Sequence, residues 1–154
     1  MRRKDREITE DEIIKDIINR ADVCRIALAV ENEPYIVTMN FGFIPEGNGI
    51  LYFHCANKGR KLDMIRKNGH VCFQMDTDHK LYEGEKGCDW GMNFLSIVGY
   101  GIISIITDND KKTEGLNAIM KHYGATDDIT YNENVVKKTT ILRLDISEIT
   151  AKKK

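Results

Sequence analysis

Arg60 and Lys61 are the residues of this chain that are best placed to do chemistry. They follow Gly59, where a strand-like segment, Ile50–Ala56, gives way to a helix-like one, Arg60–Asn68. The free N–H groups at a helix N-terminus favour anions, and cations there oppose the helix dipole. Two cations at this place therefore indicate a bound anion, and together with the N–H groups they would form a phosphate site. A solvated helix face is the other interpretation, and neither a Walker loop nor G-x-G-x-x-G is present to indicate a nucleotide.

His54 lies near the end of the preceding strand, next to the turn. Successive side chains of a strand face opposite sides. His54 therefore shares a face with Tyr52 and Ala56, whereas Phe53 and Cys55 face the other way. His54 would either contact a ligand beside the phosphate or fill a place in the core or an interface.

Thr38 and Asn40 share a face of another strand-like segment and flank Met39. Buried polar groups need hydrogen-bond partners, and a flavin ring or another heteroaromatic ligand could supply them. The alternative is a strand with one solvated face.

Trp90 is the only tryptophan and follows Cys88 and Asp89 in a polar, glycine-containing segment. A tryptophan in such a place packs over a ligand or a subunit interface, or it fills the core. Cys88 has no neighbour in the sequence that would activate it as a nucleophile.

The sequence lacks the residue patterns of several classes of enzyme. The sequence contains no G-x-S-x-G, no H-E-x-x-H and no convincing Ser-His-Asp or paired-carboxylate arrangement. Its four cysteines form no C-x-x-C pair, so we expect small buried hydrophobic residues in a reducing compartment rather than a metal site. If the protein is an enzyme, a cofactor carries the difficult step.

The composition indicates a globular domain without a strong overall electrostatic field. The 154 residues fit one domain over residues 1–154, and a net charge of -1 offers no general attraction to nucleic acid or an anionic membrane. No apolar run approaches the roughly 20 residues of a membrane span. The basic N-terminus precedes an acidic helix rather than an apolar signal core, so a cytoplasmic protein is expected.

Hydrophobic periodicity predicts the elements that position these residues. An N-terminal helix within residues 1–22 is expected to start with a capping box over Thr9–Glu12, and residues 147–154 are expected to form a frayed tail. Gly69 and Gly124 are expected to end two helices, and Thr77–Gly91 is expected to be a long loop. The predicted helices are Arg60–Asn68, Asp108–Tyr123 and Asn132–Lys138, and the predicted strands are Val23–Val30, Pro34–Phe43, Ile50–Ala56, Val71–Met75, Phe94–Ile106 and Thr139–Ile146.

This order of elements favours a mainly β fold. The first two strands form a hairpin, and only one strand–helix–strand crossover appears, whereas a doubly wound sheet needs helices between most strands. The pattern therefore predicts a small closed or nearly closed β-barrel with peripheral helices.

Taken in order, five segments resemble one known family. They are Val37–Phe41, Tyr52–Lys61, Val71–Phe73, Cys88–Trp90 and Ser96–Gly101. Together they resemble the pyridoxamine 5'-phosphate oxidase-like, FMN-binding split-barrel superfamily, and most closely its nitroimidazole-resistance branch.

The resemblance implies a six-stranded antiparallel split barrel that forms a homodimer with two flavin sites at the interface. FMN is the expected cofactor, with FAD and haem as alternatives. The resemblance implies that Gly59, Arg60 and Lys61 bind the flavin phosphate, and that His54, Cys55 and Ala56 line the ribityl chain and ring edge. It also implies that Thr38, Met39 and Asn40 run along the isoalloxazine. Ser96 and Trp90 would come from the other subunit.

The chain departs from the family pattern in two ways. Arg143 is the only arginine after Arg66, so the arginine motif that grips pyridoxine phosphate in the true oxidases is missing. Cys55 and Gly59 also stand where the family often has Ser or Thr. Pyridoxamine phosphate oxidation is therefore not the expected reaction.

The resulting hypothesis is an FMN-dependent oxidoreductase that takes electrons from a donor and reduces a small acceptor. The acceptor would be nitroaromatic, of the 5-nitroimidazole kind, or quinone-like, and His54 would deliver protons as the catalytic candidate. The alternative is a flavin- or haem-binding module without turnover, a carrier, sensor or sink, with His54 as a haem ligand.

Overall fold

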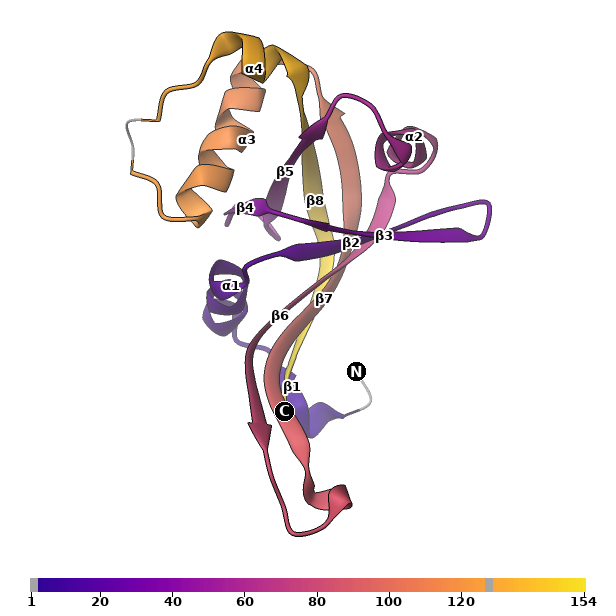
Figure 1. The fold of residues 1–154 in the computed structure, drawn as a ribbon, viewed down its shortest axis with the longest axis vertical. Coiled ribbons are helices and arrows are strands. Elements are labelled where there is room, and N and C mark those ends of the chain that lie inside the picture. The colour runs from indigo at the N-terminus through magenta and orange to yellow at the C-terminus, as the bar shows by residue number, and fades with distance from the viewer. Residues whose placement is uncertain (1–2, 127–128) are drawn as a thin grey trace.

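The fold is a single eight-stranded sheet with helices on its outside, seen in a computed structural model that describes residues 3–126 and 129–154 (Figure 1). All strand pairs are antiparallel, in the order β3-β2-β6-β7-β8-β5-β4, with β1 added to β8. The strands are β1 (Glu7–Ile8), β2 (Cys24–Val30), β3 (Glu33–Met39), β4 (Phe41–Ile44), β5 (Ile50–Ala56), β6 (His70–Tyr82), β7 (Gly91–Ile106) and β8 (Thr139–Lys153).

The two edges of this path, β3 and β4, are consecutive in the chain and are separated only by Asn40. β3 pairs with β2, whereas β4 pairs with β5. The sheet is therefore not closed by hydrogen bonds, although its two edges are joined covalently at one residue. This arrangement confirms the mainly β, split-barrel fold class. The expected count of six strands is wrong, because the sheet has eight. The single strand expected over 34–43 is also wrong, because the chain changes partner strands at Asn40.

β5 shows how the core is divided. Leu51 and Phe53 lie in the main core inside the sheet, and Ile50 and Tyr52 lie in a second cluster with residues of α3 (Asn109–His122). The first four residues of the strand are apolar on both faces because each face packs against one of these two clusters. From His54 onward the strand is no longer covered on both faces, and polar residues appear.

The remaining helices are α1 (Asp11–Arg20), α2 (Arg60–Lys67) and α4 (Glu133–Lys138), with short 3-10 turns at Lys4–Arg6 and Gly87–Asp89. The expected capping box at Thr9–Glu12 is wrong. Glu10 is the N-cap of α1 and no side chain caps the helix; the carboxylate of Glu10 instead accepts a hydrogen bond of 3.0 Å from the Thr9 amide. Residues before it form β1, so the N-terminal region is not helical throughout.

Gly69 has a role other than the expected helix cap. Asn68 is the C-cap of α2. A Cβ at Gly69 would lie 2.7 Å from the carbonyl oxygen of Ile103, and the Gly69 carbonyl accepts a bond of 2.8 Å from the Ile103 amide. Glycine therefore allows the chain leaving α2 to approach β7 closely. Gly124, in contrast, follows the C-cap of α3 at a φ of 88°, as expected.

Two segments expected to be irregular are long strands. The predicted loop over Thr77–Gly91 is wrong in its first part, because β6 runs to Tyr82 and pairs with β7 beyond a bulge between Thr77 and Lys80. These two strands extend as an arm away from the helices (Figure 1). The expected tail over 147–154 is also wrong, because β8 continues to Lys153, pairs with β7 and β1, and buries Ala151.

Among the described residues, no helix is long and apolar enough to cross a membrane.

Candidate functional site

The first turn of α2 lies against the break between β3 and β4. The Lys61 ammonium is 4.0 Å from the Met39 sulfur. Burial raises the pKa of the Cys55 thiol, and the charge of Lys61 acts in the opposite direction. Met39, Cys55 and Lys61, which come from three separate elements, therefore lie close together.

Gly59 precedes this turn in a conformation that only glycine adopts readily, with φ 139° and ψ 162°. Its carbonyl accepts the first helical bonds, from the amides of Leu62 and Asp63. The amides of Arg60 and Lys61 therefore precede the hydrogen-bonded part of the helix. A Cβ at Gly59 would meet no atom within 4 Å, so the space beside this turn is open to a ligand.

Arg60 points toward the β2–β3 hairpin. Its guanidinium makes an ion pair of 2.7 Å with Glu33 and lies 4.7 Å from the centroid of the Tyr35 ring. Both charged groups are at least half exposed, and an exposed pair of this kind contributes only about 0–1 kcal/mol. Arg60 thus carries further free N–H donors and is weakly held where it lies.

His54, Ala56, Thr38 and Asn40 are all exposed. His54 pairs with Ile141 at the end of β5, so it does not fill the core, and only the ligand and interface interpretations remain. Thr38 and Asn40 lie on a solvated face of this chain, where their polar groups are free to meet a ligand. Their roles in binding stay predictions.

Trp90 lies away from this group in the same chain. Trp90 is at the base of the turn that ends the arm, 48% exposed, with its indole N–H donating to the Gly84 carbonyl at 2.8 Å. It therefore does not fill the core. Ser96 lies on β7, in register with Asp76 and Lys152. Figure 1 shows the arm and α2 at different ends of the molecule, so one chain does not assemble all the predicted flavin contacts.

Sequence reasoning missed a charged group beside Ser96. The Asp76 carboxylate accepts bonds of 2.7 Å from both Arg25 and Gln74, and its second oxygen lies 2.6 Å from Nε2 of His79. The alternate polar residues Gln74 and Asp76 indicate a strand with one solvated face. The group was missed because Asp76 directly follows the predicted strand and His79 lies inside the predicted loop.

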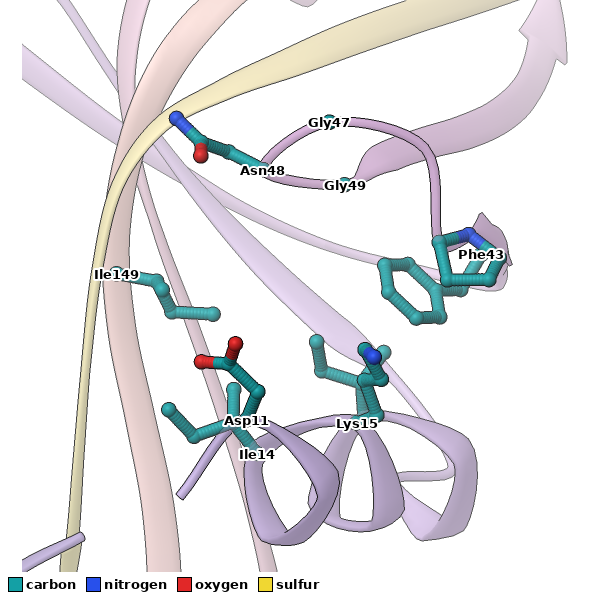
Figure 2. A pocket seen from close by; sticks show the side chains of 10 residues that line it. Asp11, Ile14, Lys15, Phe43, Gly47, Asn48, Gly49 and Ile149 are labelled. Carbon is teal, nitrogen blue, oxygen red and sulfur yellow. The ribbon is translucent and has the colours of Figure 1, made fainter. Parts of the chain in front are cut away.

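A separate pocket of about 190 Å³ lies between α1 and the turn that joins β4 to β5 (Figure 2). Asp11 and Lys15 of α1 face Phe43 and the Gly47–Gly49 turn across it, with Ile149 of β8 at one side. None of the predicted site residues lines this pocket, so it is not the flavin site that the sequence predicts.

The chain is similar to known proteins over nearly its whole length. A family model described as pyridoxamine 5'-phosphate oxidase matches residues 10–153. A proposed 5-nitroimidazole antibiotic resistance protein from Bacteroides thetaiotaomicron is 30% identical, with a TM-score of 0.82, over 96% of this chain and 86% of that one. No curated protein matches the sequence significantly.

Two more distant solved structures share the fold. The flavocytochrome Anf3 from Azotobacter vinelandii is 17% identical with a TM-score of 0.83, covering 100% of this chain and 72% of that one. The FAD and haem binding protein from Mycobacterium smegmatis is 16% identical with a TM-score of 0.82, covering 96% of this chain and 72% of that one.

Proposed function

Because the chain belongs to the pyridoxamine 5'-phosphate oxidase family, on its nitroimidazole-resistance branch, we propose that it is an FMN-dependent oxidoreductase that reduces small nitroaromatic or quinone-like molecules. The observation that carries the proposal is the open first turn of α2. Gly59 leaves free space there, the amides of Arg60 and Lys61 precede the hydrogen-bonded helix, and the Lys61 side chain of the same turn carries its ammonium against the Met39 sulfur.

These groups fit a flavin phosphate. Backbone amides at a helix N-terminus and a lysine ammonium are the donors that bind phosphate. Arg60 would add its free N–H groups, because its ion pair with Glu33 is exposed and weak. The ribityl chain would pass Cys55 and Ala56 at the end of β5, and the ring would lie along Thr38, Met39 and Asn40.

A bound flavin supplies a two-electron carrier between a reduced donor and an acceptor. The chain's own contribution is to hold the phosphate, align the ring and deliver protons. His54 is exposed at the end of β5, two residues before the turn that follows Ala56. Histidine is the side chain most often used as a general acid or base, so His54 is the residue we assign to proton delivery at the acceptor.

A homodimer would complete the site. Trp90 lies away from α2 in one chain, and we propose that it and Ser96 reach the flavin held by a second copy. Support comes from the outer face of β7, where alternate apolar residues are solvent-exposed: Val98 39%, Tyr100 42% and Ile102 52%. Apolar residues in a row on a sheet face are typical of a surface that another protein covers.

The visible spectrum of the purified protein, with FMN added, tests the proposal. We expect a flavin spectrum that a reduced nicotinamide bleaches and that a nitroaromatic acceptor restores. A flavin spectrum that no donor bleaches would favour the non-catalytic module. A Soret-type band, or no bound chromophore after FMN is added, would overturn the flavin assignment.

A further inference from the structure

Three neighbouring strands place a row of polar residues on the outer face of the sheet. Ser96 on β7 is in register with Asp76 on β6 and with Lys152 on β8. Residues in register on neighbouring antiparallel strands project from the same face, so these three side chains share one face. Phe94 and Val98, two positions either way along β7, share it as well. With Gln74 and His79, they line a pocket of about 500 Å³.

Ser96 is the feature that marks this pocket as a binding site. It is 8% exposed and is the one polar residue among the described residues that is classed as buried. Its hydroxyl makes no hydrogen bond to another described residue and is not itself enclosed, so it is open to solvent in the pocket that Ser96 lines. An unpaired hydroxyl that faces a pocket can donate a hydrogen bond to, or accept one from, a molecule bound there.

The charges around Ser96 favour an anionic or oxygen-rich ligand. Both oxygens of Asp76 are already engaged, one by Arg25 and Gln74 and the other by His79. Lys152 has no ion pair with a described carboxylate, and its ammonium lies 5.4 Å from the centroid of the Phe94 ring. The pocket therefore presents a free cation and a free hydroxyl next to an aromatic and an aliphatic side chain.

We infer that this pocket binds the electron acceptor, as a planar aromatic molecule that carries a nitro or carboxylate group. Its ring would pack on Phe94 and Val98, and its oxygens would meet Lys152 and Ser96. This inference rests on the proposed function, in which Ser96 reaches the flavin of a second copy. It assigns the acceptor to residues of β6, β7 and β8 rather than to the first turn of α2.

Calorimetric titration of the FMN-loaded protein with 4-nitrobenzoate, without any electron donor, tests the inference by binding alone. We expect Lys152→Met to weaken 4-nitrobenzoate binding about tenfold, as loss of a charge-assisted contact does. Lys153→Met is the matched control, because Lys153 is the next residue of the same exposed strand end and projects from the other face. Phe94→Leu should also weaken binding, and FMN affinity should change less than twofold in all three variants.

The outcomes separate this inference from the proposed function. If the wild-type protein binds FMN but not 4-nitrobenzoate, or if Lys152→Met and Lys153→Met bind 4-nitrobenzoate equally well, the pocket assignment is wrong while the flavin proposal stands. If the wild-type protein binds no FMN, the proposed function fails and this inference fails with it.

Discussion

The ammonium of Lys61 lies 4.0 Å from the sulfur of Met39 and so joins the first turn of α2 to the end of β3. Met39 is the last residue before the chain leaves one edge of the sheet at Asn40 and begins the other at Phe41. The proposed phosphate end and ring end of the flavin site are thus held together where the barrel is split.

Gly59→Ala should destabilise the protein although the new methyl group meets no atom. Its φ of 139° is strained for any L-residue, at a cost of about 1–3 kcal/mol. Thermal unfolding should therefore occur several degrees lower, and FMN binding should weaken. Gly87→Ala is the control, because its Cβ also meets open space but its φ lies outside the strained range. Equal melting temperatures for the two variants would show that the Gly59 conformation costs nothing.

Glu33→Gln should tighten FMN binding. The substitution removes the ion pair of 2.7 Å that holds Arg60 on the β2–β3 hairpin and so frees the guanidinium for the phosphate. A gain of about two- to fivefold in affinity corresponds to an exposed pair of up to about 1 kcal/mol. Glu31→Gln removes the same charge from the same hairpin without touching this pair. An equal gain in both variants would mean that only net charge matters, and Arg60 would have no part in binding.

Stability should fall at alkaline pH through Cys24. Burial raises the pKa of the Cys24 thiol, so the unfolded chain loses this proton near pH 8.5 while the folded chain keeps it. The contribution is therefore fully present below about pH 8.5 and is lost above it, at about 1.4 kcal/mol per pH unit. Urea unfolding between pH 8 and 10 should show a smaller decline for Cys24→Ala than for the wild type.

Cys88→Ala serves as the comparison for Cys24→Ala, because Cys88 is exposed in the folded chain. It should retain the wild-type decline of stability with pH. If Cys24→Ala also retained it in full, the buried thiol would not be the group whose titration is observed.

Sedimentation analysis should report a dimer for the wild-type protein and a monomer for Val98→Lys. Val98 is 39% exposed and lies two residues from Ser96 on the proposed interface, and a buried unpaired charge would oppose association there. Ile36→Lys is the control, because Ile36 is 66% exposed on the edge strand β3. A wild-type monomer that holds flavin would contradict the two-copy site.

The hydrophobic pattern of the sequence predicted the elements whose residues are contiguous in the chain. The apolar run of β5 and the glycine-bearing turn after it are contiguous in the sequence, so strand Ile50–Ala56 and the helix start at Arg60 were placed correctly. The break at Asn40 was not predicted, because nothing near it signals that the chain changes partner strands. β6 and β8 were predicted too short, since their outer parts leave the barrel and lose the apolar periodicity that marks a core strand.

The same limit applies to the site. Gly59, Arg60 and Lys61 could be recognised together because one turn carries them. The pairing of Arg60 with Glu33 and that of Arg25 with Asp76 join residues far apart in the chain. Such partners are set by strand register, which the sequence pattern left open.

The most direct measurement of the central claim is the ratio of FMN to riboflavin affinity, since the two ligands differ only in the phosphate. Charge-assisted hydrogen bonds of about 1.5–3 kcal/mol predict that the wild type binds FMN at least about tenfold more tightly than riboflavin. Lys61→Met should reduce this ratio by about tenfold, whereas Lys67→Met, at the other end of α2, should leave it unchanged. Equal affinities for FMN and riboflavin in the wild type, or an unchanged ratio in Lys61→Met, would contradict a flavin phosphate bound at this turn.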